Sequence, residues 1–237
     1  MFELNPELEI VAITDIGPDK RKAMIIENIY KNPDEVRELC IKLPKQDQFE
    51  LCQHHPGSRV FIEHKEIHKN LEPLFRQLCC DEQYWERPTD IQCLNRSLAA
   101  LGFMCNVSNS ESVTKKPLGL LPHQDYYSFQ PSPFQFGAVI YLNKGEEEQG
   151  GTDMWSFCGK QTIDDNLTHL YKDYDIVKMR ADVYDSVMAW RQEFMFGMKF
   201  NRCILYQADV LHAPFMTSGM FDTCDRMTQV LFFSCLS

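Results

Sequence analysis

The sequence predicts one domain of the α+β class, in which helices flank a mainly β core. Two observations lead to this class. Before about residue 100, apolar residues recur at the spacing of helices that bury one face. After it, short apolar runs are separated by clusters of turn residues, which is typical of strands. We therefore divide the single domain, residues 1–237, into a largely helical and β support region, 1–100, and a β core, 101–237.

The support region is predicted to contain one strand, Ile25–Tyr30, and two helices. Asn32-Pro33-Asp34-Glu35 is a helix start, because a capping residue is followed by Pro in the first turn and by acids near the positive end of the helix dipole. We expect this helix to end near Pro44 and the second to span Lys65–Cys79, each with its apolar face against a sheet. Those faces are formed by Val36, Leu39, Cys40 and Leu43 and by Ile67, Leu71, Leu74, Phe75 and Leu78.

The core region contains four runs with strand character, with a turn and an inserted segment among them. The runs are Phe103–Val107, Phe136–Asn143, Leu205–Pro214, where the Pro is expected to end the strand, and Met227–Phe233. Gly150-Gly151 is interpreted as a hairpin turn that needs positive φ. The inserted segment is expected at about 160–199, and within it Asn166–Tyr174 and Val183–Phe196 look partly helical.

The triplet His123-Gln124-Asp125 is the first candidate for chemistry. On an extended strand, residues two apart point to the same side, so His123 and Asp125 can reach one metal while Gln124 faces away. Such a triplet also recurs by chance, and an isolated His or Asp is more often a surface or capping residue. A third ligand has to come from elsewhere, and His212 lies at the end of an apolar run. Two imidazoles and a carboxylate can occupy one face of an octahedral Fe(II) and leave other positions open.

The order of motifs along the chain supports this interpretation. It runs through Asn106 on its apolar stretch, His123-Gln124-Asp125, Tyr141-Leu142-Asn143, Gly150-Gly151-Thr152, His212 and Arg226-Met227-Thr228. This order resembles the Fe(II)/2-oxoglutarate-dependent dioxygenases, in particular their prolyl-hydroxylase-like branch, over roughly Phe103–Phe233 with an interruption between Gly159 and Phe200. The resemblance implies a double-stranded β-helix, or jelly roll, as the core.

The resemblance also implies roles for individual residues. His123, Asp125 and His212 would be the Fe(II) ligands and the catalytic centre. Arg226 would bind the distal carboxylate of 2-oxoglutarate, since a guanidinium binds a carboxylate in bidentate fashion. Thr228 would add a hydroxyl donor on the same side of the strand. Tyr141 is a further candidate for that carboxylate, and Lys144 would replace Arg226 if the anchor lies elsewhere.

Structural explanations exist for the same residues. Arg226 alternatively pairs with Asp222 or Asp225 on the surface, a contact worth little. Tyr141 is alternatively a core aromatic whose hydroxyl has a protein partner.

The implied activity is hydroxylation of a C–H bond, with O₂ as a second cosubstrate. Two other classes stay open. One is a non-catalytic, cupin-like jelly roll that binds a ligand, and the other is a metal-dependent hydrolase or isomerase with Zn or Mn.

Composition limits the partners. The formal net charge of −10 argues against a broad nucleic-acid-binding face, and a small-molecule or peptide substrate, small or basic, is easiest to accommodate. No run approaches the ~20 apolar residues that span a bilayer, and Met1–Glu7 lacks the form of a signal peptide. The ten cysteines lack CxxC spacing, so we expect reduced thiols in a cytoplasmic protein, with the sequons at Asn95, Asn106 and Asn166 unused. The sequence does not define an oligomeric state.

Several aromatic and histidine residues complete the candidates. The inserted segment gathers Tyr171, Tyr174, Tyr184, Trp190, Phe194 and Phe196, which suggests a lid or substrate-selecting wall, or equally a packing layer or oligomer contact. Tyr126, Tyr127 and Phe129 follow the triplet and are candidates for the substrate side or for packing. His54, His55, His64 and His68 are interpreted as solvated or locally hydrogen-bonded residues.

Overall fold

The structure is a computed structural model that describes residues 1–42, 58–62, 65, 69–79, 85, 98–108, 121–125, 135–163, 189–217 and 219–235. Within these residues the helices are α1 (Pro33–Ile41), α3 (Glu72–Cys79) and the 3₁₀ turn η3 (Gly145–Glu147). The strands are β1 (Glu9–Ile16), β2 (Arg21–Glu27), β3 (Ser58–Phe61), β4 (Leu98–Ser108), β5 (Phe136–Tyr141), β6 (Gly151–Phe157), β7 (Trp190–Gly197), β8 (Cys203–Gln207), β9 (His212–Phe215) and β10 (Asp225–Cys235).

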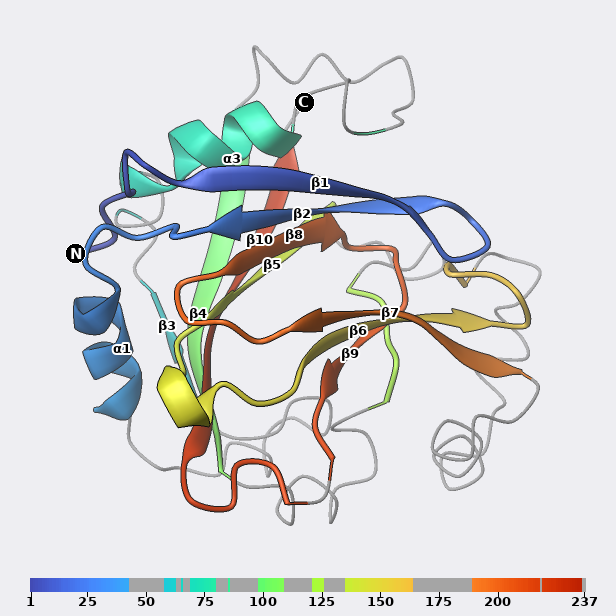
Figure 1. Ribbon diagram of the computed structural model, residues 1–237. Helices are drawn as coiled ribbons and strands as arrows, with labels where there is room; N and C mark the ends of the chain where they lie inside the picture. Colours follow the sequence, from blue (N-terminus) through green and yellow to red (C-terminus); the bar gives the residue numbers. More distant parts are fainter. Residues whose placement is uncertain are drawn as a thin grey trace.

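The strands form two antiparallel sheets with a jelly-roll core, as the sequence predicted (Figure 1). The large sheet has the order β1-β2-β8-β5-β10-β4-β3, and the small sheet has the order β7-β6-β9. Chain neighbours such as β5 and β6 lie in different sheets, so the chain crosses repeatedly from one sheet to the other. Such crossings bring the ends of sequence-distant strands together between the sheets.

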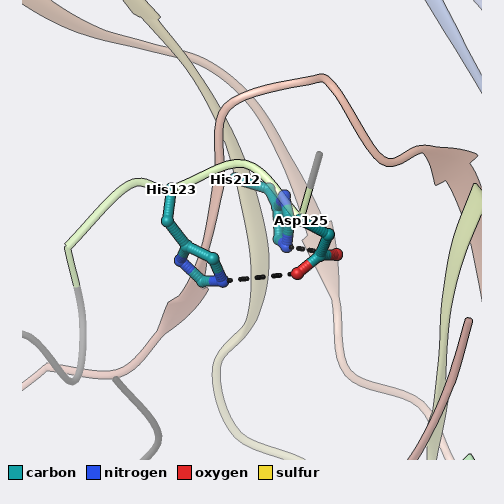
Figure 2. Close-up of side chains that lie close together, drawn as sticks. All are labelled: His123, Asp125 and His212. Carbon is teal, nitrogen blue, oxygen red and sulfur yellow. Dashed lines mark ion pairs between the residues drawn. The ribbon is translucent and has the colours of Figure 1, made fainter. Parts of the chain in front are cut away.

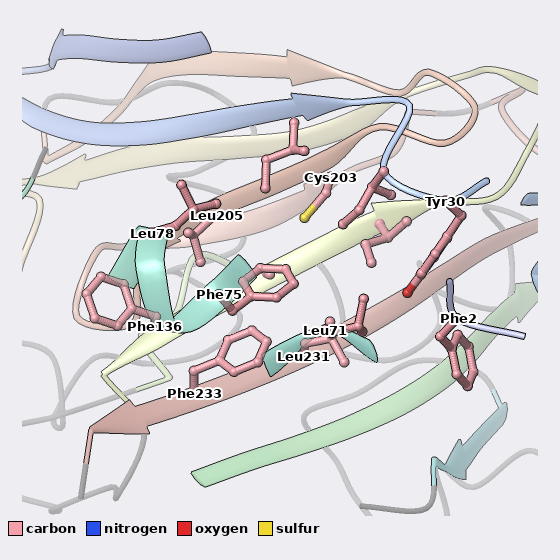
Figure 3. Close-up of a cluster of buried hydrophobic side chains, with 14 of the residues drawn as sticks. Phe2, Tyr30, Leu71, Phe75, Leu78, Phe136, Cys203, Leu205, Leu231 and Phe233 are labelled. Carbon is pink, nitrogen blue, oxygen red and sulfur yellow. The ribbon is translucent and has the colours of Figure 1, made fainter. Parts of the chain in front are cut away.

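One hydrophobic core lies between the two sheets, and a second lies on the outer face of the large sheet. Between the sheets, residues of β5 and β8, including Tyr141 and Tyr206, meet Met154 and Phe196 of the small sheet. On the outer face, α1 and α3 pack onto the large sheet, with Phe75 stacked on Phe233 at 4.3 Å between ring centroids (Figure 3). The predicted role of the helices as support for a sheet is confirmed.

The support region contains more strand than predicted. Its described residues include β1, β2 and β3, all in the large sheet, so the expectation of a largely helical region is wrong for them. The strand predicted at Ile25–Tyr30 corresponds to β2, which begins earlier, at Arg21, because its pairing with β1 extends to that residue, and ends earlier, at Glu27. α1 begins at Pro33 as predicted, although the side chain of Asn32 makes no capping hydrogen bond. Of the predicted helix Lys65–Cys79, α3 covers the second half.

The predicted inserted segment is partly core. β7 occupies the end of Val183–Phe196, where helix was expected, and pairs with β6 along its whole length. The helical expectation failed there because an aromatic run without clear polar alternation fits both periodicities, and pairing with β6 decides for the strand. Phe196 and Trp190 are buried in the cores on the two faces of the small sheet, so for them packing is the observed role. Residues 164–188, which include Asn166–Tyr174, lie outside the described residues.

Gly150 and Gly151 lie at the start of β6, which pairs with β7 on one side and with β9 on the other. Gly150 has the predicted positive φ, 68°, but the predicted hairpin is wrong, because the strands before and after it, β5 and β6, lie in different sheets. A Cβ on Gly150 would stand 2.2 Å from the Phe215 carbonyl oxygen, and one on Gly151 only 1.9 Å from that of Phe196. The backbone on each side therefore excludes any side chain at these positions.

We expect Gly151→Ala to destabilise the protein by roughly 3 kcal/mol or more, the upper end for overpacking, because the contact is with backbone that cannot turn away. Gly197→Ala is the matched control. Gly197 pairs directly with Gly151, and a Cβ there would have no neighbour within 4 Å. Urea unfolding of both variants measures the difference, and equal stabilities would contradict the steric explanation.

Candidate metal centre

Three predicted ligands are brought to one place by the crossing between β8 and β9. The run predicted as one strand, Leu205–Pro214, divides into β8 in the large sheet and β9 in the small sheet, with a turn between them. His212 is the first residue of β9 and forms a two-way backbone pair with His123, at 2.9 Å in each direction. Pro214 was expected to end the strand, but it lies inside β9. A Pro is tolerated there because β9 is an edge strand of the small sheet.

The side chains of His123, Asp125 and His212 converge (Figure 2). Their potential ligand atoms all lie within 4.8 Å of one another. Nε2 of His212 is 3.4 Å from Oδ2 of Asp125, and Nε2 of His123 is 3.9 Å from Oδ1 of the same carboxylate. The His212 and Asp125 side chains are 6% and 11% exposed, but that of His123 is 32% exposed, so the cluster is accessible on the His123 side.

Backbone carbonyls set the tautomers of both histidines. Nδ1 of His123 lies 3.1 Å from the Leu121 oxygen, and Nδ1 of His212 lies 2.9 Å from the Val210 oxygen. A carbonyl only accepts, so each Nδ1 carries the hydrogen, and in the neutral ring Nε2 presents a lone pair. Metal-binding histidines ordinarily donate their other ring N–H to a carbonyl or carboxylate in this way.

The donor set fits a divalent cation. Oδ2 of Asp125 is buried and has no hydrogen-bond partner in the structure. Its separation of 3.4 Å from Nε2 of His212 exceeds the 2.7–2.9 Å of a charge-assisted hydrogen bond. A shared cation would satisfy both atoms, whereas without one a buried carboxylate oxygen remains uncompensated.

Gln124 faces away from this cluster, as predicted, and fixes the segment that carries it. Its side chain is 4% exposed; Nε2 donates to the Asp209 carbonyl, and Oε1 accepts from the Ile163 N–H at 2.9 Å. The Asp125 N–H donates to the Ala208 carbonyl at 2.8 Å. The triplet is thus tied to the turn between β8 and β9 that positions His212.

The candidate carboxylate anchors lie together on the inner face of the large sheet. Thr228 of β10 pairs with Tyr141 of β5, and Arg226 is two residues away on the same face as Thr228. The Arg226 guanidinium lies 6.0 Å from the centre of the Tyr141 ring and donates to the Gly151 carbonyl at 3.1 Å. The structure therefore brings together the three residues that the resemblance suggested.

Arg226 is a buried cation. It is 5% exposed, so the alternative of a surface ion pair with Asp222 or Asp225 is wrong. Burial lowers its pKa from the ordinary value, and no ion pair to it is found among the described residues. Its Nε has no hydrogen-bond partner. Since a buried charge normally has a counter-charge, the environment suits an anionic ligand.

Tyr141 and Lys144 fit the anchor role less directly. The Tyr141 hydroxyl is buried and donates to Oγ1 of Thr152 at 2.8 Å, so it has the protein partner expected of a core tyrosine. Burial raises the pKa of Tyr141 to about 12. Lys144 points to the surface, where Nζ is 2.5 Å from Asp34.

Tyr206 and Gly137 belong to this interior and were not singled out in the sequence. The Tyr206 ring packs on His212 with centroids 4.6 Å apart. A Cβ on Gly137 would lie 3.0 Å from that ring and 3.1 Å from Oδ2 of Asp125, so any side chain there would press on both groups. The sequence signal for Gly137 was a glycine within the strand Phe136–Tyr141, which indicates a close approach.

Asn143 positions Arg226. The side chain is fully buried; Nδ2 donates to the Asp225 carbonyl at 2.8 Å, and Oδ1 accepts from the Met227 N–H at 2.7 Å. These two bonds hold the backbone on both sides of Arg226. Asn143, the third residue of the motif Tyr141-Leu142-Asn143, therefore fixes the backbone that carries Arg226.

We expect Asn143→Ala to weaken 2-oxoglutarate binding roughly tenfold, because the loss of two buried hydrogen bonds releases the Arg226 backbone. Asn201→Gly is the matched control. Asn201 makes the same two-way clamp on Tyr30, and glycine tolerates its positive φ. Calorimetric titration compares the two, and an equal loss of affinity would show that the effect is general destabilisation.

Comparisons with known proteins identify the family. The model of a family of unknown function, DUF6445, matches residues 7–226. The chain belongs to the DUF6445 family. A comparison of this DUF6445 protein with curated proteins found no match.

Solved structures resemble this DUF6445 member at low identity. EvdMO1 has a TM-score of 0.52 at 12% identity, with 99% of this chain and 56% of that chain covered. A prolyl 4-hydroxylase from Phytophthora capsici has a TM-score of 0.45 at 13% identity, covering 94% and 60%. HygX from Streptomyces hygroscopicus, solved with nickel and 2-oxoglutarate, has a TM-score of 0.44 at 12% identity, covering 92% and 84%. The chain thus spans little more than half the length of the first two, and the likeness to EvdMO1 supports the fold.

Several predicted residues lie outside the described part of the chain. These are Tyr126, Tyr127, Phe129, His54, His55, His64 and His68, together with the sequons at Asn95 and Asn166. Within the described part, no helix is both long and apolar enough to cross a membrane.

Proposed function

We propose that this protein is an Fe(II)- and 2-oxoglutarate-dependent oxygenase that hydroxylates a C–H bond of a small molecule or of an amino-acid side chain, free or in a peptide. One observation carries the proposal. A cluster of two histidines and a carboxylate shares its interior with a buried guanidinium that has no ion-pair partner among the described residues. The cluster would bind the metal, and the guanidinium would bind an anionic cosubstrate that chelates this metal.

Tyr206 and Tyr141 connect the two features through the core between the sheets, to which both tyrosines belong. The Tyr206 ring contacts that of His212, with centroids 4.6 Å apart. The Arg226 guanidinium lies 6.0 Å from the centre of the Tyr141 ring. Burial, together with the charge of Asp125, raises the pKa of Tyr206 well above its ordinary value.

The metal ligands and the carboxylate anchors would have separate roles in this reaction. His123, Asp125 and His212 would hold Fe(II) on one face and leave the opposite positions for ligands. Arg226 and Thr228 would bind the distal carboxylate and so orient the keto acid toward the metal. Bound Fe(II) would supply the oxidising chemistry with O₂, with 2-oxoglutarate as the co-reactant that is converted to succinate and CO₂. Asp125 would take the position that a halide would otherwise need, which favours hydroxylation over halogenation.

An anaerobic titration tests the proposal. Fe(II) and 2-oxoglutarate together should produce a weak visible charge-transfer band that neither produces alone, and O₂ should then yield succinate. Zn(II) in place of Fe(II) is the control and should bind without a band. Binding of metal without a band or succinate would instead indicate a hydrolase or isomerase, and absence of metal binding would indicate a ligand-binding jelly roll.

A further inference from the structure

A cavity of about 260 Å³ lies beside the turn between β1 and β2, where that turn approaches the segment after β6 (Figure 1). The two segments are joined by the N–H of Gln161, which donates to Asp19 at 2.7 Å. Gln207, at the end of β8, forms a further part of the wall. Trp85 completes the described lining, so four separate parts of the chain form the cavity.

The described lining is strongly basic. Lys20, Arg21, Lys22 and Lys160 contribute four cations, against one lining carboxylate, Asp19. Neutral hydrogen-bonding groups come from Thr162 and Gln207. This local charge is opposite in sign to the net charge of −10 of the whole chain.

Two of the four cations are already compensated. Arg21 pairs with Asp209 at 2.7 Å, and Lys160 lies 3.6 Å from Asp19. No ion pair to Lys20 or Lys22 is found within the described residues. The cavity thus has a surplus of positive charge, which an anion would neutralise.

The wall of the cavity adjoins the candidate metal centre. Thr162 precedes Ile163, whose N–H donates to Gln124, and Gln207 precedes Ala208, whose carbonyl accepts from Asp125. Asp209, the partner of Arg21, also accepts from Gln124 through its carbonyl. A ligand held here would contact Thr162 and Gln207, whose chain neighbours are bonded to the segment that carries His123 and Asp125.

We infer that this cavity binds the carboxylate or phosphate group of a small anionic substrate. The assignment of this ligand as a substrate rests on the function proposed above. Lys20 and Lys22 form the ion pairs, and Arg21, held in place by Asp209 and Gln207, adds a fixed positive charge. The overall acidic charge favours a small or basic substrate, but the local charge at this cavity selects an anionic one.

The first test is direct binding of inorganic phosphate, with acetate as the carboxylate probe, by calorimetric titration without metal or 2-oxoglutarate. Lys20→Ala/Lys22→Ala should weaken binding of the preferred probe roughly tenfold, through loss of two ion pairs. Lys31→Ala/Lys42→Ala is the control with the same charge change on the surface, where each lysine faces its own glutamate. If neither probe binds, or if the double variant at Lys20 and Lys22 binds like the wild type, the inference is overturned.

The second test assigns the ligand as substrate. Small molecules supplied in pairs, as free acids or phosphate monoesters and as the neutral amides or esters, are compared for stimulation of succinate formation by the Fe(II)-loaded protein. Anionic members should be preferred, and Lys20→Ala/Lys22→Ala should raise their KM and leave kcat largely unchanged. Equal stimulation by neutral members overturns the substrate assignment. Failure of the proposed oxygenase function would appear separately, as absence of the charge-transfer band, while phosphate binding needs neither metal nor cosubstrate.

Discussion

We expect Asp125→Ala to lower the affinity for Fe(II) by at least ~100-fold and to abolish succinate formation by the proposed oxygenase. Asp125 is the one carboxylate of the cluster and lies between the two imidazoles, 3.4 Å from His212 and 3.9 Å from His123. Its loss removes the negative charge and one ligand together. Replacing only a group that hydrogen-bonds to a metal ligand lowers metal affinity about 10–100-fold. Loss of a direct ligand should therefore lower the affinity further.

The same variant should not weaken the metal-free protein. Oδ2 of Asp125 is buried without a hydrogen bond, so removing the carboxylate relieves a desolvated charge. We expect an equal or higher Tm without metal and no rise in Tm when Fe(II) is added anaerobically. Asp222→Ala, at an exposed carboxylate, is the control and should retain the full rise. A metal-induced rise in Tm that survives Asp125→Ala would exclude the assigned ligand set.

We expect Arg226→Met to raise the KM for 2-oxoglutarate by roughly 100-fold and to leave Fe(II) binding intact. Arg226 is buried and has no ion-pair partner among the described residues, so the cosubstrate carboxylate would be its counter-charge. Charge-assisted bidentate bonds of this kind are worth about 3 kcal/mol, which corresponds to that factor. Methionine keeps most of the volume and removes the charge.

A shorter keto acid makes this test specific. Pyruvate has the chelating end of 2-oxoglutarate but no distal carboxylate, so its weak affinity should be equal in the wild type and in Arg226→Met. Arg37→Met is the control, because Arg37 pairs with Glu147 at 2.7 Å away from the cluster. If Arg226→Met binds 2-oxoglutarate like the wild type, the anchor is another group, and Tyr141 becomes the next residue to replace.

The candidate site was partly predictable because some of its chemistry is local. Alternation along an extended segment predicts His123 and Asp125 on one side and Gln124 on the other. The structure has this arrangement, although the triplet forms only an isolated bridge with His212 and no strand of its own. The positive φ of Gly150 also follows from short-range backbone geometry, whereas the predicted hairpin there is not formed. The roles of His123, Asp125, His212, Arg226, Thr228 and Tyr141 as ligands or anchors stay predictions until the variants are measured.

Other features depended on contacts that local patterns do not contain. The aromatic run ending at Phe196 fits a helix or a strand, and pairing with β6 decided between them. The hydroxyl of Tyr141 pairs with Thr152, although the sequence equally allowed it a ligand role. Tyr206 and Gly137 entered the site only through the close approach of Asp125 to β5 and β8.

The sequence by itself determined which side chains of the triplet share a side and the kind of chemistry that its side chains can perform. Only the tertiary structure decided that His212 meets His123, that Arg226 is buried, and that Lys20 and Lys22 line one cavity with Lys160. The physical reason is the range of the interactions. Side-chain alternation acts over a few residues, whereas sheet order, register and burial are set by hydrogen bonds and packing between segments far apart in the chain.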